Sequence, residues 1–184
     1  MFRFLLIFFI LNFYNPAFSS TKEKMISRMQ LTESLSFNFI QTIDNKSENG
    51  KCVIKYPKKI WCKYDNSSKK IIVSDGKSLV IKTANKSSYY IYPLRKTPLE
   101  FLLDKRYLIS KIKILEPREI DDKYLNFKFF ENNNEINVFF DKKNLNLIGW
   151  QTTDIYKNLT ITFISSIKIN QKINNKIFIL PKYN

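Results

Sequence analysis

Cys52 and Cys62 are the only cysteines in the 184-residue sequence, and their spacing favours a disulfide bond. Apolar and polar residues alternate on both sides of the turn that begins at Pro57, so the segment predicts a hairpin in which the two cysteines face each other. Directly opposed Cβ atoms lie roughly 4.5–5.5 Å apart, which a disulfide accommodates after slight adjustment. A pair of buried free thiols is the alternative. We expect the bond, which requires an oxidising compartment.

The sequence contains no histidine and only three glycines, which removes most catalytic and cofactor-binding arrangements. Serine or cysteine nucleophiles lack the usual base, a zinc site lacks its usual ligands, and a dinucleotide or phosphate loop lacks its glycines. Paired carboxylates could still hydrolyse glycosides. We expect no enzyme, no catalytic residue, no cofactor and no metal, because the one dense acidic cluster lies beside a proline and predicts a solvated loop: Glu116, Glu119, Asp121 and Asp122.

Residues 1–19 have the features of a secretory signal peptide. A single arginine precedes an apolar stretch, a proline follows that stretch and breaks any helix, and small residues lead to a cleavage position after Ser19. The stretch is shorter than the roughly 20 residues that span a bilayer, although a retained N-terminal anchor is the alternative. We expect the protein to be exported, with residues 20–184 forming a single domain.

The formal net charge is +15, from 31 Lys and Arg residues against 16 Asp and Glu residues. A charge of this size attracts anionic surfaces, acidic partners or nucleic acid. A biased genome composition is the competing explanation, because Lys, Asn, Ile, Phe and Tyr are abundant along the whole chain. Export, and a sequence without a basic-aromatic motif or recognition helix, argue against nucleic acid as a partner.

The first half of the chain predicts two helices with a series of short strands between them. Residues 21–34 are amphipathic, and residues 97–104 open with Thr97, Pro98 and Glu100 in the order of a capping box. Between the helices the apolar residues recur with period two, which is typical of strands. The predicted strands cover residues 36–42, 51–56, 60–64, 70–74, 78–83 and 89–92.

The second half alternates again, with Leu159, Ile161 and Phe163 as one apolar set, and it brings the total to about eleven strands. Strands joined by short turns favour one large antiparallel sheet over alternating β-α-β units. A sheet of this size curls, and two short helices are all that is expected to cover its concave face. We predict a mainly β (α+β) fold, an incomplete β-barrel with an N-terminal helix and a short central lid helix over an apolar cavity. The predicted strands of this half cover residues 111–115, 124–130, 135–140, 145–150, 159–164 and 176–180.

Several segments, taken in order, resemble the LolA family of outer-membrane lipoprotein carriers. A strand that begins with Phe37 and ends with Gln41 is followed by a Gly-led strand, a turn at a proline and an aromatic strand. A hydrophobic-Val-Ser-Asp-Gly turn follows at residues 72–76, and a Thr-Pro-led helix begins at Thr97. The C-terminal half matches more loosely, through Phe140, Asp141, Asp154, Thr160, Ile161, Asn170 and Phe178. The order of the motifs, rather than any single one, carries the resemblance.

The resemblance implies a monomeric, half-open β-barrel in the periplasm with a helical lid over an apolar cavity. Such proteins take acylated lipoproteins from an inner-membrane ABC-type release complex and pass them to an outer-membrane acceptor lipoprotein, without covalent chemistry. In the family, an arginine just before the turn proline reaches the lid and holds the empty form closed. Tyr56 stands at that position here, so it could reach the lid only through an uncharged hydroxyl. A dedicated acceptor need not exist.

We predict that nine side chains of the sheet and lid line the cavity, although each could be ordinary core. Lys58, Lys59 and Lys63 are expected to face solvent or to dock an acidic partner. Three other functions compete with transport: a lipid-binding or lipoprotein-sensing module, a secreted structural β protein with a filled core, and a histidine-independent hydrolase. The predicted lining residues are Phe37, Phe39, Ile54, Tyr56, Ile60, Tyr64, Leu99, Leu102 and Leu103.

Overall fold

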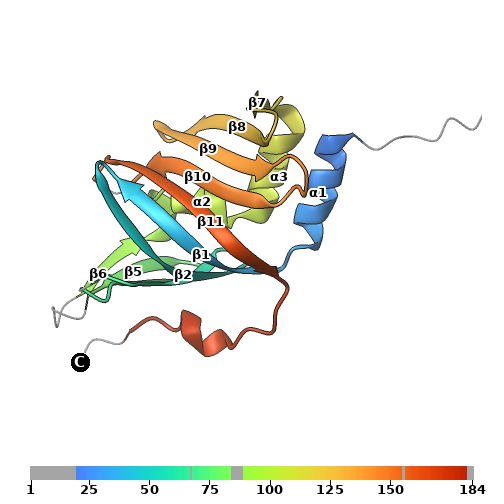
Figure 1. Cartoon of the computed structure of the whole chain (residues 1–184). Coiled ribbons are helices and arrows are strands. Elements are labelled where there is room, and N and C mark those ends of the chain that lie inside the picture. The colour runs from blue at the N-terminus through green and yellow to red at the C-terminus, as the bar shows by residue number, and fades with distance from the viewer. Residues whose placement is uncertain (1–19, 67, 84–88, 155, 182–184) are drawn as a thin grey trace, which may run out of the picture.

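Eleven antiparallel strands form one continuous, curved sheet in the computed structural model of the chain (Figure 1). The structure describes residues 20–66, 68–83, 89–154 and 156–181, so the predicted signal peptide, residues 1–19, lies outside the described residues. The strands are β1 (Ser34–Ile43), β2 (Lys46–Lys55), β3 (Lys59–Tyr64), β4 (Ile71–Asp75), β5 (Ser78–Lys82), β6 (Tyr89–Pro93), β7 (Arg118–Ile120), β8 (Tyr124–Glu131), β9 (Asn134–Asp141), β10 (Leu147–Thr153) and β11 (Leu159–Ile169).

The order of the strands explains why helices cross the concave face. The sheet runs β6-β5-β4-β3-β2-β1-β11-β10-β9-β8-β7, so β6 and β7 are its two edges. The chain must pass from one edge to the other between these strands, and this connection carries the helices (Figure 1). The predicted fold class, a mainly β incomplete barrel of about eleven strands with a central helical cover, is confirmed. The connection consists of η1 (Leu94–Lys96), α2 (Leu99–Leu103) and α3 (Lys105–Ile114).

The N-terminal helix α1 (Thr21–Leu31) begins with a capping box. The Ser20 side chain accepts a hydrogen bond from the Glu23 backbone N–H at 3.2 Å, and the Glu23 carboxylate accepts one from the Ser20 N–H at 2.7 Å. Met25 anchors the helix, because its side chain is fully buried in the core. The predicted helix is confirmed, and it ends at Leu31. In the described part of the chain, every helix is too short or too polar to cross a bilayer.

Two segments predicted as strands are helical. Of the predicted strand 111–115, residues 111–114 belong to α3, where Leu108 and Ile112 are buried at a helical spacing of four, and Leu115 is the C-cap. The alternation of lysine and isoleucine fits a strand equally well, but Asp104 caps the helix by accepting a hydrogen bond from the Tyr107 N–H at 3.1 Å. The other segment, 176–180, contains the 3-10 turn η2 (Asn175–Phe178). The short edge strand β7 was not predicted.

The start of α2 also differs from the prediction. Thr97 does not cap this helix, because its hydroxyl donates to the Leu94 carbonyl at 2.8 Å. Pro98 occupies the N-cap position without a side-chain hydrogen bond. The predicted capping box is therefore wrong, although a helix forms at the predicted place. The Glu100 carboxylate, which the box would have used, binds Lys58 instead.

Most of the core lies on the concave face of the sheet, where β8 and β9 supply alternating aromatic and aliphatic side chains. In β11 the buried positions are not those of the apolar set Leu159, Ile161 and Phe163 that the sequence shows. Thr160, Thr162 and Ile164 are buried, whereas Leu159 and Phe163 are 48% and 55% exposed on the outer face. The polar inward positions mean that the hydrophobic pattern alone identifies the wrong face of this strand.

Candidate functional site

The nine predicted lining residues gather in one region, and three of them, Leu99, Leu102 and Leu103, belong to α2, which we define as the lid. Every one belongs to, or packs against, a single apolar cluster between the concave face and the helices. Leu99 and Tyr56 lie partly exposed at its margin. The other seven are buried: Phe37, Phe39, Ile54, Ile60, Tyr64, Leu102 and Leu103. This form of the protein therefore keeps its interior packed, and contact between these side chains and a ligand stays a prediction.

A small apolar cavity, here called the inner cavity, lies directly beneath the lid. Its free volume is about 10 Å³, room for no more than about one water molecule. The leucines of the lid form one wall, and Trp150 of β10 contributes to the opposing sheet wall. The lining residues are Ile54, Leu99, Leu102, Leu103, Leu108, Val138, Leu147 and Trp150.

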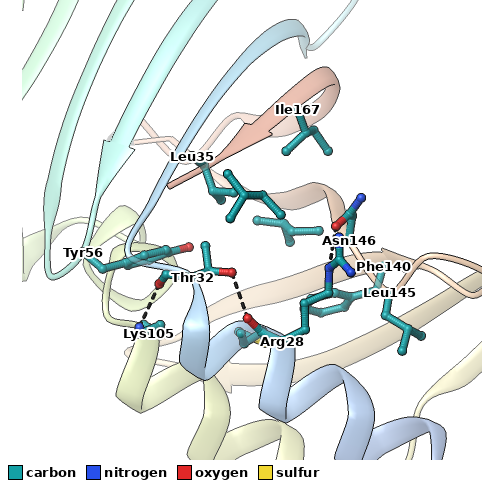
Figure 2. A pocket seen from close by; sticks show the side chains of 12 residues that line it. Arg28, Thr32, Leu35, Tyr56, Lys105, Phe140, Leu145, Asn146 and Ile167 are labelled. Carbon is teal, nitrogen blue, oxygen red and sulfur yellow. Dashed lines mark hydrogen bonds between the residues drawn. The ribbon is translucent and has the colours of Figure 1, made fainter. Parts of the chain in front are cut away.

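A second apolar space, the mouth pocket, opens where the end of α1 meets β1, β11 and the turn before β10 (Figure 2). Its free volume is about 30 Å³. Leu147 lines both the mouth pocket and the inner cavity, so the two spaces adjoin at this residue. The apolar lining consists of Met29, Leu35, Tyr56, Phe140, Leu145, Leu147, Ile167 and Ile169.

Two cations lie at the rim of the mouth pocket (Figure 2). Lys105 Nζ donates to the carbonyls of Gln30 and Thr32, both at 2.8 Å, at the C-terminal end of α1. These carbonyls carry the negative end of the helix dipole, which a cation stabilises. Arg28 Nε donates to the side-chain oxygen of Asn146 at 2.8 Å. Each cation is thus held by uncharged oxygen atoms.

Lys58 fastens the lid to the β2–β3 turn. Its Nζ lies 2.5 Å from Glu100 Oε1 and 3.4 Å from Asp104 Oδ2, and its backbone N–H donates to the Leu103 carbonyl at 2.9 Å. The hydrogen bond to Glu100, with further support from Asp104, raises the pKa of the Lys58 ammonium above its usual value. We call Lys58, Glu100 and Asp104 the latch. Ser74 positions it, because the Ser74 hydroxyl donates to the Lys58 carbonyl at 3.1 Å.

The latch was missed in the sequence, where Lys58 was expected to face solvent or to dock an acidic partner. A usable signal was present, since a lysine directly follows the turn proline and two acids stand four residues apart around the lid helix. One cation can reach both acids only if the turn lies against that helix, and this contact depends on the three-dimensional fold.

Tyr56 lines the mouth pocket rather than fastening the lid. Its ring lies 5.8 Å from Lys105 Nζ, and its backbone N–H donates to the Glu33 carbonyl at 2.9 Å. Burial raises the pKa of the Tyr56 hydroxyl above its usual range, so the group is uncharged at physiological pH. Within the described residues, this hydroxyl makes no hydrogen bond to the lid. Lys58, two positions later, supplies a cationic contact to the lid instead.

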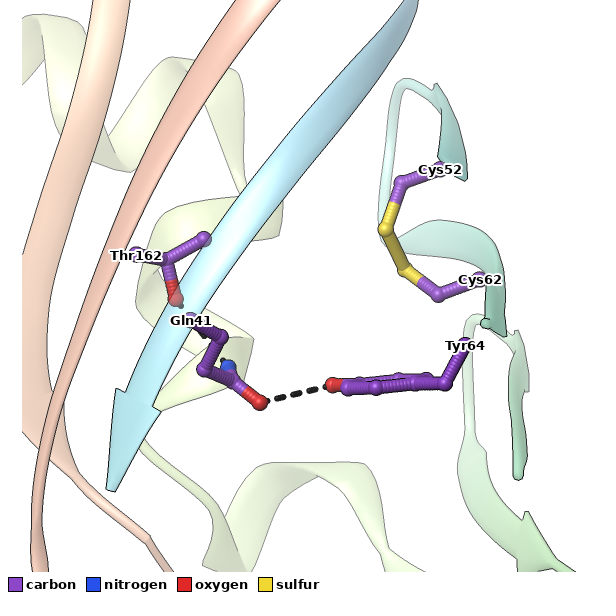
Figure 3. The surroundings of a disulfide bond; sticks show 5 residues. All are labelled: Gln41, Cys52, Cys62, Tyr64 and Thr162. Atoms are coloured by element: carbon purple, nitrogen blue, oxygen red, sulfur yellow. Dashed lines mark hydrogen bonds between the residues drawn. A yellow bond between two sulfur atoms is a disulfide. The ribbon is translucent and has the colours of Figure 1, made fainter. Parts of the chain in front are cut away.

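The predicted disulfide joins Cys52 of β2 to Cys62 of β3 in the wall of the barrel (Figure 3). Both cysteines are buried on the concave face. Beside them, the Tyr64 hydroxyl donates to Gln41 Oε1 at 2.7 Å, and Gln41 Nε2 donates to the Thr162 hydroxyl at 3.0 Å. These bonds connect β3, β1 and β11, which fixes the wall and explains the glutamine of the first motif.

Because Gly50 has no side chain, the rings of Phe39 and Tyr64 can pack together beside it, with their centroids 4.8 Å apart. It pairs with both residues across the sheet. A Cβ at this position would clash with the backbone carbonyl oxygen of Lys63 and would lie 2.9 Å from ring atoms of Phe39. We expect Gly50→Ala to lower the free energy of unfolding by about 1–3 kcal/mol, because the tightly packed neighbours must move. Urea denaturation measures this loss against the exposed control Lys51→Ala. Equal stability of the two variants would contradict the proposed packing.

The acidic cluster lies at the surface as an ion-pair network. Glu119 and Asp122 both contact Lys142, and Glu116 Oε1 lies 2.6 Å from Lys22 Nζ. The side chains of Glu116 and Asp122 are 85% and 87% exposed, as expected for a solvated segment. Among the described residues, no group of three or more His, Cys, Asp or Glu side chains is placed to hold a metal ion.

Comparisons with known proteins identify the family. A comparison with curated proteins found no match. A LolA superfamily protein from Nitrosomonas europaea is similar in structure at 11% identity and a TM-score of 0.48, over 88% of this chain and 99% of that one. A chain of the MucA/MucB complex of Pseudomonas aeruginosa is similar in structure at 7% identity and a TM-score of 0.48, over 89% of this chain and 62% of that one. This chain therefore spans less than two thirds of the length of that neighbour. The profile of the outer membrane lipoprotein carrier protein LolA matches residues 30–180, and the chain therefore belongs to the LolA family.

Proposed function

We propose that this protein is a periplasmic carrier that binds the acyl chains of lipoproteins and shuttles them from the inner to the outer membrane. The observation that carries the proposal is an apolar interior closed by a short helix whose polar attachment to the sheet is the latch. Membership of the LolA family supports the same function. The protein would act by non-covalent binding alone, as a monomer.

Loading must open the lid, because the two cavities of the closed form have free volumes of only about 10 and 30 Å³. Burying an acyl chain contributes about 0.8 kcal/mol per methylene group, which is on the order of 10 kcal/mol for a chain of about sixteen carbons. Part of this free energy is spent in separating the lid from the sheet. A carrier needs this unfavourable free energy of lid opening to limit its affinity, since it must shield the chain and still release it.

The acyl chain and the lid leucines are both apolar, and this shared property explains how the chain can take the place of the lid against the sheet. Leu99, Leu102 and Leu103 present apolar surface to the interior, so an acyl chain can replace them against the sheet without exposing the sheet to water. The displaced lid would then cover the chain from outside. The side chains of the sheet and of its β2–β3 turn that are predicted to contact the chain lie in or against the same apolar cluster as the lid leucines: Phe37, Phe39, Ile54, Tyr56, Ile60 and Tyr64.

The proposed partners are acylated lipoproteins, an inner-membrane ABC-type complex that releases them, and an acceptor lipoprotein on the outer membrane. A direct test adds the purified, exported protein to spheroplasts or to inner-membrane vesicles that contain the release complex. Appearance of a soluble one-to-one complex with an acylated lipoprotein supports transport. Binding of an apolar probe without release of any lipoprotein would instead indicate a lipid-binding or lipoprotein-sensing module.

The small free volumes favour a second candidate, a secreted structural protein with a filled core. The two functions differ in whether the lid separates from the sheet in solution. Hydrogen exchange of the amides of α2 measures this separation. Exchange far faster than that of β2 and β3 supports the carrier, and exchange only on global unfolding supports the structural protein.

A further inference from the structure

The mouth pocket combines an apolar interior with a cationic rim. Leu35, Phe140 and Ile167 are among the side chains that form its walls, and Arg28 and Lys105 are its charged lining residues (Figure 2). Its lining contains no carboxylate. An acyl chain that leaves the interior through this opening would therefore place its polar end beside two positive charges.

Neither cation is neutralised by an ion pair within the described part of the chain. The ion pairs of this part join acids to other lysines, such as Lys58, Lys111 and Lys142. Arg28 donates to an amide oxygen, and Lys105 donates to two backbone carbonyls and lies near the Tyr56 ring. The charge of Lys105 is partly compensated by the negative end of the α1 helix dipole. One of its three ammonium protons is left for a ligand. The guanidinium of Arg28 keeps four of its five N–H donors beyond the bond to Asn146.

We propose that the mouth pocket selects amphiphiles with an anionic head group, phosphate or carboxylate, whose acyl chain enters the interior. This inference rests on the proposed function, since it assumes that the interior accepts acyl chains. The wider charge of the protein has the same sign, +15 overall, and would concentrate anionic amphiphiles near the mouth. Hydrogen bonds to charged groups are stronger than neutral ones, and we expect about tenfold tighter binding of an anionic than of a zwitterionic head group.

The test uses the exported product of the full chain with Trp61→Phe, so that Trp150 in the wall of the inner cavity is the fluorescent reporter. Lysophospholipids with one brominated acyl chain and either a phosphatidylglycerol or a phosphatidylcholine head group are titrated, because bromine quenches tryptophan at close range. A brominated fatty acid tests carboxylate in place of phosphate. We expect the phosphatidylglycerol form and the fatty acid to bind about tenfold more tightly than the phosphatidylcholine form.

Variants then test whether the cations at the rim of the mouth pocket cause the preference for anionic head groups. Arg28→Gln should reduce the preference severalfold, Arg28→Lys should retain most of it, and Lys51→Gln, an equal loss of charge on β2, should leave it unchanged. Thermal melting confirms that each variant is folded, and Arg28 tolerates substitution because it is exposed. Equal binding of all head groups, or a preference unaffected by Arg28→Gln, would overturn this inference while the carrier proposal stands. Failure of every lipid to quench Trp150 would overturn both.

Discussion

Replacing Lys58 with methionine will raise the rate of acyl-chain uptake by about tenfold. The substitution removes the cation that lies 2.5 Å from Glu100 Oε1 and 3.4 Å from Asp104 Oδ2. A partly buried hydrogen bond between charged groups contributes about 1.5 kcal/mol, which corresponds to about a tenfold increase in the open fraction. Stopped-flow quenching of Trp150 by a brominated acyl chain measures the rate.

Lys63→Met is the matched control for this variant, because Lys63 is exposed on the neighbouring strand β3. Its uptake rate should equal that of the wild type. An unchanged rate in Lys58→Met would contradict the latch, and the lid would then be held by its leucines alone. Faster uptake in both variants would point to net charge as the cause.

The latch also predicts how uptake depends on pH. The pKa of Lys58 is raised above its ordinary value of 10.5. A cation with a raised pKa stabilises the closed lid fully below its ordinary pKa, and this stabilisation is lost as the pH rises through the raised value. Deprotonation of Lys58 therefore leaves uptake unaffected between pH 7 and 10 and accelerates it above about 10.5 in the wild type. Lys58→Met should lack this acceleration.

Leu102→Glu will abolish acyl-chain binding, with a loss of affinity of at least about a hundredfold. Leu102 is 6% exposed and faces the inner cavity. A carboxylate there has no partner in the apolar interior, and an unpaired buried charge costs several kcal/mol. The lid therefore cannot close over an acyl chain, whereas the sheet keeps its own core.

The control for this variant is Ile114→Glu at the end of α3, since Ile114 is 76% exposed. It introduces the same charge into the same connection without placing it in the cavity. Circular dichroism and melting report whether the sheet stays folded, and titration with the brominated lipid reports binding. Wild-type affinity in Leu102→Glu would show that the lid leucines do not contact the ligand.

The sequence predicted the sheet well where local geometry decides the structure. Cys52 and Cys62 are equally distant from Pro57, and a hairpin turn at that proline places them opposite each other. Short alternating segments were less informative. Residues 111–115 alternate like a strand, yet residues 111–114 are helical, because the cap at Asp104 and the packing of the preceding turn outweigh the pattern.

The site could be predicted only in part. All nine predicted lining residues lie in or against the core cluster. For those on the strands this follows from alternation, since every second side chain of a strand faces the same side of the sheet. The β11 set was misleading, because buried Thr160 and Thr162 make the inner face of that strand the more polar one. The mouth pocket draws on α1, β1, α3 and the turn before β10, and no local pattern brings such distant segments together.

Transport requires that an acyl chain enter the space between the lid and the sheet, and the two tryptophans test this entry directly. Trp150 lines the inner cavity, whereas Trp61 lies between Ile60 and Cys62, which are both buried on the concave face, so its side chain lies on the outer face. Single-tryptophan proteins, made with Trp61→Phe or Trp150→Phe, are titrated with a brominated fatty acid. Saturable quenching of Trp150 with Trp61 unaffected is the predicted result. Equal quenching of both tryptophans, or none of Trp150, would show that the chain does not enter this interior.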